Sequence, residues 1–143
     1  MRRILIGLAL ALVALPAPAW AQTRDENVAR CVSAPDPASP DLKIGACTAL
    51  LQSGQEAANN IPIIYYDRGN GYRKEGLYDQ AIADYSQAIA LNPNYANAYN
   101  NRGIAYEYKN QRDQAIADYR MALKIDPNHQ SSLSALKRLG VTP

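Results

Sequence analysis

Apolar and small side chains recur every three or four positions through the middle of the chain, a spacing that places them on one face of a helix. Two such helices are predicted over about 62–75 and 79–91. Their packing faces consist of Tyr65, Gly69 and Tyr72 in the first and of Ala81, Tyr85 and Ala88 in the second. Small residues opposite large rings let two helices approach closely while the rings fill the space on either side.

The same pattern is repeated further along the chain. The heptapeptide Asp79–Tyr85 recurs unchanged 34 residues later, and 14 of 34 positions are identical between the units 62–95 and 96–129. A second pair of helices is therefore predicted over about 96–109 and 113–125. Its packing faces hold Tyr99, Gly103 and Tyr106 in the first helix and Ala115, Tyr119 and Ala122 in the second.

Proline is expected to end the second helix of each unit. Pro93 follows Asn92, and Pro127 follows Asp126. A proline disfavours helical geometry in the residue before it, so each helix should end at or before these two residues.

These residues resemble the tetratricopeptide repeat family. The family pattern expects aromatic, Leu, Gly, Ala and Pro residues at eight positions of a 34-residue unit, and both units match seven of them. The resemblance implies an all-α fold, an α-solenoid of helix-turn-helix repeats. Both units depart from the pattern at one position, where Arg68 and Arg102 replace the usual Leu.

The repeated arginines have a repeated acidic counterpart, Asp84 and Asp118. We expect each Arg to pair with an Asp on the second helix of its own or an adjacent repeat, since a half-buried, multiply hydrogen-bonded pair is plausible chemistry. The alternative is two solvated charges on separate faces. In either case the role is structural.

Shorter elements flank the two repeats within a domain expected over 41–140. Ser39, Pro40 and Asp41 are typical of a helix start, and Gly54 of a helix end, so 41–54 is predicted to be the second helix of an N-terminal half-repeat. A Pro-rich segment, 22–40, is expected to replace its first helix. After the repeats, Ser131 and Ser132 are expected to cap a terminal helix over 130–140.

The N-terminus has the layout of a secretory signal. Two arginines precede the apolar run Ile4–Leu15, and Ala19 and Ala21 are the small residues expected before cleavage, which gives a signal peptide over 1–21. The alternative, a membrane anchor, is disfavoured because spanning helices need about 20 apolar residues. We therefore expect a periplasmic or secreted protein without an integral membrane span.

Charge argues against nucleic acid as a partner. The chain has 15 basic and 13 acidic residues, and the loss of Arg2 and Arg3 with the signal would leave 13 of each. A neutral chain without a basic stripe is poorly suited to neutralising phosphates.

The two cysteines, Cys31 and Cys47, are expected to form a disulfide, because export would place them in an oxidising compartment. The bond would close a loop of 17 residues and contribute about 3 kcal/mol in the chain-entropy model. The alternative is two unpaired thiols.

A partner-binding surface is expected on the first helix of each repeat, opposite its packing face. In tetratricopeptide proteins this surface lines a concave groove that binds peptides or helices. Candidate contact residues are Tyr66, Asn70, Arg73, Lys74, Asn97, Asn100, Asn101 and Tyr108, with Ile63, Asp67, Ile104 and Glu107 beside them. The alternative is a solvated helix face with no tuned ligand.

Catalysis, metal binding and cofactors find little support in the sequence. The single histidine, His129, follows Pro127-Asn128 in a turn, and we expect it to be solvated rather than a base.

The function expected is a non-enzymatic adaptor or scaffold that binds a peptide or protein in the periplasm. The alternative is a self-assembling structural homo-oligomer of the cell envelope.

Overall fold

The computed structural model describes residues 23–32 and 39–142. The predicted signal peptide, residues 22 and 33–38 of the Pro-rich segment and the C-terminal residue lie outside this part of the chain. All regular structure in the described residues is helical, which confirms the all-α class. The helices are α1 (Arg24–Val32), α2 (Pro40–Ser53), α3 (Ile61–Lys74), α4 (Tyr78–Leu91), α5 (Ala96–Tyr108), α6 (Arg112–Ile125) and α7 (Gln130–Arg138).

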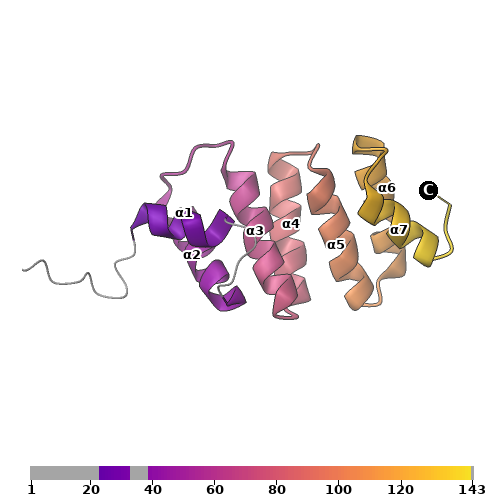
Figure 1. The fold of residues 1–143 in the computed structure, drawn as a ribbon, viewed down its shortest axis with the longest axis horizontal. Helices are drawn as coiled ribbons and strands as arrows, with labels where there is room; N and C mark the ends of the chain where they lie inside the picture. The colour runs from indigo at the N-terminus through magenta and orange to yellow at the C-terminus, as the bar shows by residue number, and fades with distance from the viewer. Residues whose placement is uncertain (1–22, 33–38, 143) are drawn as a thin grey trace, which may run out of the picture.

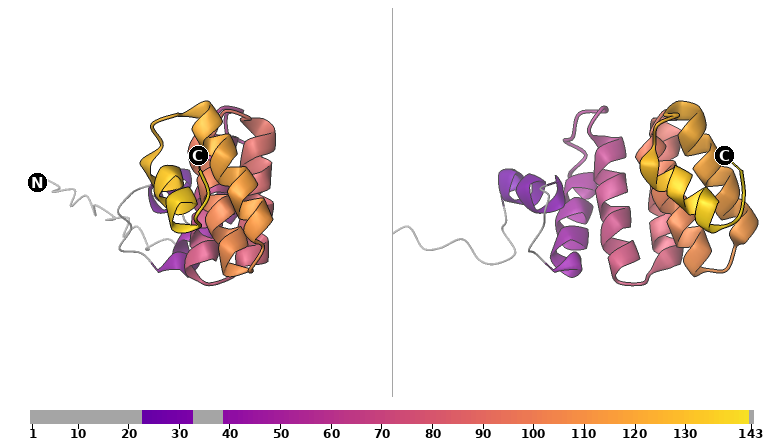
Figure 2. Two further views of the ribbon diagram at one scale, coloured as in Figure 1. Left: turned by 90° about the vertical axis from the view of Figure 1, so that its right-hand side faces the viewer. Right: turned by 45° about the vertical axis from the view of Figure 1, so that its right-hand side comes forward.

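The helices form a solenoid. Each helix packs against the next one along the chain, and α3 also contacts α1 and α5, the helices two places before and after it. Figure 1 shows α2 to α6 standing side by side in chain order, with α1 lying across one end and α7 at the other. The side view in Figure 2 shows the same row of helices with α7 leaning against one side of it. A repeat array of this kind has no central core, because each repeat buries its apolar face on its neighbours.

The predicted helix boundaries of the two repeats hold to within one residue. The second helices end at Leu91 and Ile125, directly before Asn92-Pro93 and Asp126-Pro127. At each end the backbone N–H of the residue before proline donates to an alanine carbonyl of the last helical turn, Ala88 or Ala122. Proline therefore ends these helices without an unpaired amide at the junction.

Each repeat is built around one buried tyrosine. Tyr85 and Tyr119 are fully buried and lie against the glycine of the preceding helix. A Cβ added at Gly69 or Gly103 would lie 2.8 Å from the tyrosine Cε1, well inside van der Waals contact. The glycines were expected to let the backbones approach, and the structure shows that the space they leave is taken by a ring.

The remaining packing tyrosines surround the repeated arginines. The Arg68 guanidinium lies 5.6 Å from the ring centre of Tyr65 and 5.8 Å from that of Tyr72. Arg102 has the same arrangement with Tyr99 at 5.5 Å and Tyr106 at 5.9 Å. The faces of these half-buried rings stabilise the cation.

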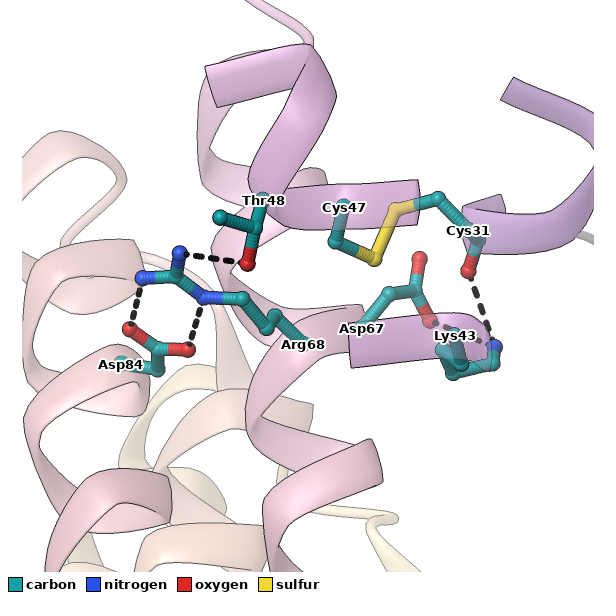
Figure 3. The surroundings of a disulfide bond; sticks show 7 residues. All are labelled: Cys31, Lys43, Cys47, Thr48, Asp67, Arg68 and Asp84. Carbon is teal, nitrogen blue, oxygen red and sulfur yellow. Dashed lines mark hydrogen bonds and ion pairs between the residues drawn. A yellow bond between two sulfur atoms is a disulfide. The ribbon is translucent and has the colours of Figure 1, made fainter. Parts of the chain in front are cut away.

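The predicted Arg–Asp pairs are present, and each lies within its own repeat. Arg68 donates from Nε and Nη2 to the two carboxylate oxygens of Asp84, at 2.7 and 2.8 Å. Arg102 and Asp118 make the same bidentate pair at 2.8 Å for both bonds. The third nitrogen reaches back to a hydroxyl of the preceding second helix, Thr48 or Ser86. An Arg in place of Leu thus joins three helices, as Figure 3 shows for Arg68.

The N-terminal expectation is wrong for residues 24–32, which form helix α1 instead of part of a loop. A capping box starts this helix: Thr23 N–H donates to the Glu26 carboxylate at 3.0 Å, and Glu26 N–H donates to Thr23 Oγ1 at 3.3 Å. The pattern Thr-x-x-Glu was readable in the sequence as a helix start. Helix α1 lies across one end of the row of helices and contacts α2 and α3.

The predicted disulfide attaches α1 to α2. Cys31 and Cys47 are bonded and fully buried, with Cα atoms 4.9 Å apart (Figure 3). Beside them the buried Lys43 donates from Nζ to the Cys31 carbonyl at 2.9 Å and lies 3.9 Å from Asp67 Oδ1. The cross-link and the lysine together pin the end of α1 to the solenoid.

The C-terminal cap also differs from the prediction. Helix α7 starts after His129, whose Nδ1 accepts the backbone N–H of Ser132 at 3.3 Å. His129 is therefore the capping residue, and Ser132, expected in that role, is fully buried. Helix α2 begins at Pro40, one residue before the predicted bound, and the Ser39 side chain makes no capping hydrogen bond.

Candidate partner-binding face

The exposed sides of α3, α5 and α7 lie along one side of the solenoid, and we call this surface the first-helix face. It contains the predicted contact residues of α3 and α5 together with Ser131, Ser134 and Arg138 of α7. Two hollows, of about 450 and 250 Å³, lie between α5 and α7 and share Ile104 and Arg138 in their linings. The first-helix face is therefore recessed between α5 and α7.

Asparagines on this face are hydrogen-bonded to one another. Asn101 Nδ2 donates to Asn70 Oδ1 at 2.8 Å and to the Tyr66 hydroxyl at 3.0 Å, which connects α5 to α3. The Tyr85 hydroxyl donates to the same Asn70 oxygen at 2.8 Å. The buried tyrosine of the first repeat thus orients two side chains of the surface.

The same network continues to α7. Asn100 Nδ2 donates to Asn101 Oδ1 at 3.0 Å, and Ser132 Oγ donates to Asn100 Oδ1 at 3.0 Å. His129 closes the chain, with Nε2 2.9 Å from Asn97 Oδ1. A continuous set of side-chain hydrogen bonds therefore crosses three first helices, which rigidifies the surface.

This network changes the role of Asn100. Its side chain is only 5 % exposed, and both ends of its amide are engaged by Asn101 and Ser132. Asn100 therefore positions its neighbours Asn101 and Ser132. Direct contact with a partner stays a prediction for the more exposed of the predicted contact residues. Lys74, Asn97 and Tyr108 are exposed, whereas Tyr66, Asn70, Arg73 and Asn101 are half-buried.

In the second repeat the buried tyrosine hydroxyl meets a carboxylate, whereas in the first repeat it meets an amide. Its buried Tyr119 donates its hydroxyl to Glu107, and Arg138 of α7 makes a bidentate pair with the same carboxylate at 2.8 Å for both bonds. The hydrogen bond from Arg138 holds the pKa of Glu107 below its usual range. Burial, followed by the bond to Glu107, raises the pKa of Tyr119, so its hydroxyl keeps its proton.

Aromatic surface borders the face near the ends of α3 and α5. Tyr108 is 61 % exposed and stacks on Tyr78, with ring centres 4.7 Å apart and planes 4° from parallel. Further in, Tyr66 packs against Tyr95 with ring centres 4.9 Å apart. Flat rings with polar tips are common in protein-binding surfaces.

Asp67 is the acidic group of this face with an unusual environment. Burial raises its pKa to about 6, although the nearby Lys43 and a hydrogen bond from Asn70 oppose the shift. Asp67 is half-buried, and Lys43 Nζ is 3.9 Å from its Oδ1, too far for a hydrogen bond.

A cavity at the N-terminal end of the face was missed by sequence reasoning. It has a volume of about 350 Å³ and lies between α1, α2 and the first turn of α3. Its lining consists of Arg24, Asp25, Val28, Ala29, Val32, Leu50, Glu56, Asn60, Ile63 and Ile64. Of these residues only Ile63 had been placed on the binding surface, because no helix was predicted over 24–32 to form the opposite wall. The capping box at Thr23 was the available signal for the helix that forms this wall.

Two further properties concern the described residues alone. No helix within 23–32 and 39–142 combines the length and apolar character needed to cross a bilayer. The same residues contain no group of three or more His, Cys, Asp or Glu side chains able to hold a metal ion.

Sequence comparisons identify repeats in the central part of the chain. A family model described as "TPR repeat" matches residues 69–110, and one described as "Tetratricopeptide repeat" matches residues 96–129. A comparison with curated proteins gave no match.

Comparison with solved structures gives the same fold. The human RPAP3 first TPR domain is similar at 25 % identity and a TM-score of 0.65, covering 71 % of this chain and 76 % of that one. The first TPR of Spaghetti (RPAP3), bound to the HSP90 peptide SRMEEVD, has 27 % identity and a TM-score of 0.62, covering 71 % and 77 %.

A third similar structure is YrrB, described as a TPR protein with an unusual peptide-binding site. Identity is 26 % and the TM-score 0.62, over 68 % of this chain. The chain spans about half of the YrrB chain, 48 % of its length. With the two family-model matches and the shared architecture, these likenesses show that residues 69–129 form tetratricopeptide repeats.

Proposed function

We propose that this protein is a non-enzymatic adaptor that binds a peptide or protein partner along the first-helix face. The observation that carries the proposal is the hydrogen-bonded network from Tyr85 through Asn70, Asn101 and Asn100 to Ser132. It holds the polar groups of three helices in place before any partner arrives. Binding to a preorganised surface loses less side-chain entropy than binding to a mobile one.

Two features of this face suit a peptide or a partner helix. The hollows between α5 and α7 offer recesses for side chains, and the exposed Tyr108 offers flat apolar area beside them. Similar solved structures include one bound to an HSP90 peptide and one described as having a peptide-binding site, which supports the same use here.

The proposed place of action is the periplasm. The signal-like N-terminus predicts export, and the Cys31–Cys47 disulfide is of a kind that persists in oxidising compartments. The disulfide supports export, because free cysteines are kept reduced in the cytosol.

Site-specific photo-crosslinking in the source cells tests the proposed function. A photoreactive amino acid replaces one exposed residue at a time: Lys74 or Tyr108 on the first-helix face, and Leu91 of α4 as the control. Leu91 is 52 % exposed and lies on a second helix, so it matches Tyr108 in accessibility and differs in location. We expect a discrete adduct from the first-helix face and none from Leu91.

The same experiment separates the adaptor from the homo-oligomer. An adduct with twice the mass of the protein, formed equally at Leu91 and Tyr108, would support self-assembly and contradict the adaptor. An Asn101→Ala variant should weaken the partner adduct, because it removes the bonds to Asn70 and Tyr66 that orient the face. Changing Asn100 is a poor test, since its buried side chain also holds α7.

A further inference from the structure

The cavity between α1 and α3 is open to solvent and largely apolar. Val28, Ala29 and Val32 of α1 form one wall, and Leu50, Ile63 and Ile64 lie opposite. Ile63 and Val32 remain 39 % and 41 % exposed, although both are large aliphatic residues at the mouth. Its volume of about 350 Å³ falls at the lower end of the range for ligand sites, so it suits one bulky side chain.

The charged residues at the mouth are unbalanced. Arg24, Asp25 and Glu56 line the cavity, so its lining carries a net charge of −1. Arg24 is engaged, because its Nε and Nη2 donate to the Glu56 carboxylate at 2.9 and 3.0 Å. Asp25 is 96 % exposed at the side chain and lies 3.9 Å from Arg24 Nη1, too far for a hydrogen bond.

A second carboxylate lies one helical turn further along the face. Asp67 is four residues after Ile63 on α3, so the two side chains share one side of the helix. Lys43, whose Nζ lies 3.9 Å from Asp67 Oδ1, already donates to the Cys31 carbonyl. A partner that covers the cavity and the first two turns of α3 therefore meets two acidic groups, and the cations beside them, Arg24 and Lys43, are both already engaged.

We infer that the cavity binds the aliphatic or aromatic side chain of a partner segment that carries a Lys or Arg within about two residues of that anchor. The apolar lining recognises the anchor, and Asp25 and Asp67 recognise the cation. Ile63 and Asp67 are four residues apart on α3, a rise of about 6 Å along the helix. Alternate residues of an extended peptide are separated by about the same distance, so the anchor and the cation should lie about two residues apart. This inference rests on the proposed partner-binding function and adds to it the chemical class of the segment.

The cavity depends on helix α1, which lies outside the two repeats. The wall residues Val28 and Val32 belong to α1, which precedes the regions matched by the family models, 69–110 and 96–129. The disulfide at Cys31 fixes this wall in place, since Cys31 is the residue before Val32. Ile63 joins the cavity to the first-helix face.

Nuclear magnetic resonance on the oxidised, ¹⁵N-labelled protein, exported by a bacterial expression host, tests the inference. The probes are three capped tripeptides: acetyl-Leu-Ser-Lys-amide, acetyl-Leu-Ser-Glu-amide and acetyl-Ser-Ser-Lys-amide, used at about 1 mM and above. We expect the first probe to shift the amide signals of Val28, Val32 and Ile63. The Glu probe should bind about twofold to fivefold more weakly, as expected for an exposed ion pair.

Matched variants identify the two contributions. Ile63→Ser should weaken binding of the Leu-Ser-Lys probe by about tenfold through lost apolar contact, while Leu91→Ser, a similarly exposed apolar residue on α4, should leave it unchanged. Asp25→Ala should reduce the preference for Lys over Glu without removing binding of the Leu anchor. The acetyl-Ser-Ser-Lys probe should cause no shifts at the cavity.

Three results would overturn the inference. They are the absence of shifts at the cavity with every probe, equal binding of the Lys and Glu probes, and equal binding before and after Ile63→Ser. Shifts confined to Asn70, Asn101 and Tyr108 would also reject the cavity, yet they would leave the proposed function standing. Conversely, tripeptide binding at the cavity without any crosslinked adduct at Tyr108 in cells would reject the function proposed for the first-helix face.

Discussion

The repeats 62–95 and 96–129 place the same residues at the same depth but present different surfaces. Both contain a fully buried tyrosine against a glycine and a bidentate Arg–Asp pair. On the first-helix face, however, the hydroxyl of Tyr85 reaches an amide, Asn70, whereas that of Tyr119 reaches a carboxylate, Glu107.

This contrast shows which parts of a repeat are free to vary. The core positions must fit a neighbouring helix, so both copies keep the same volumes and the same paired charges. The surface positions face solvent or a partner, and a change there alters chemistry without disturbing packing. The following predictions test whether the cores are equivalent and whether the surfaces differ as the contacts indicate.

The largest effect is expected from breaking an Arg–Asp pair. Asp84→Asn and Asp118→Asn should each lower the free energy of unfolding by about 3 kcal/mol, because a largely buried arginine loses its counter-charge. Urea denaturation followed by circular dichroism measures the loss. Replacing both partners with apolar residues, Arg68→Met with Asp84→Leu, should recover most of it. A loss in one repeat alone would show that the two cores are not equivalent.

The next effect concerns the glycines. Gly69→Ala and Gly103→Ala should each cost about 1–3 kcal/mol, since the new methyl group would meet a buried ring at 2.8 Å. Gly45→Ala in α2 is the matched control, because nothing lies within 4 Å of its added Cβ. It should raise the unfolding free energy by up to about 1 kcal/mol through helix propensity. Thermal unfolding measures all three variants. If the ring contact decides, the melting temperature should fall for Gly69→Ala and Gly103→Ala and rise for Gly45→Ala.

A smaller effect should separate the two repeats. Tyr85→Phe removes a hydrogen bond to a neutral amide and should cost about 0.5–1.5 kcal/mol, whereas Tyr119→Phe removes one to a carboxylate and should cost about 1.5–3 kcal/mol. Denaturant unfolding of both variants measures the difference. Equal losses would mean that the charge of Glu107 adds nothing, in disagreement with the different surface chemistry described above.

The pH dependence of stability should have opposite signs for two acids. The pKa of Glu107 is lowered in the folded protein by Arg138, so its contribution is present above the usual pKa of 4.5 and is lost as pH falls below it. Burial raises the pKa of Asp67 from 3.8 to about 6, so the folded protein binds more protons and stability falls as pH rises through this interval.

Two variants isolate these terms. Relative to the unmodified protein, Glu107→Gln should flatten the loss of stability on acidification below pH 4.5. Asp67→Asn should remove the decrease in stability between pH 3.8 and about 6. Unfolding free energies measured across pH 3 to 7 test both. Parallel curves for the unmodified protein and Asp67→Asn would contradict the buried position of Asp67.

Most of the repeat fold was predictable from local information. The 34-residue period, the packing residues and the helix ends near Pro93 and Pro127 all depend on spacing within one helix or on the residue before a proline. The Arg68–Asp84 pair was also predicted, because its members recur together in both repeats. The helix at 24–32 was missed, although its Thr-x-x-Glu start was readable.

The candidate site was predicted less completely. The spacing on α3 and α5 correctly placed Asn70, Asn100 and Asn101 on first helices, but spacing within one helix does not show which side chains of neighbouring helices touch. Asn100 is buried because Ser132 of α7 reaches it, a contact 32 residues away in the chain. The role of His129 as a cap likewise depends on where α7 turns back.

By itself the sequence determined that this chain forms paired helices in a repeat array, because a 3.6-residue period and a 34-residue period are both written in local order. Only the tertiary structure decided that the asparagines are joined in one network and that α1 closes a cavity over Ile63. The physical reason is that helix faces follow from residue spacing, whereas contacts between helices depend on crossing angles, depth and cross-links such as Cys31–Cys47.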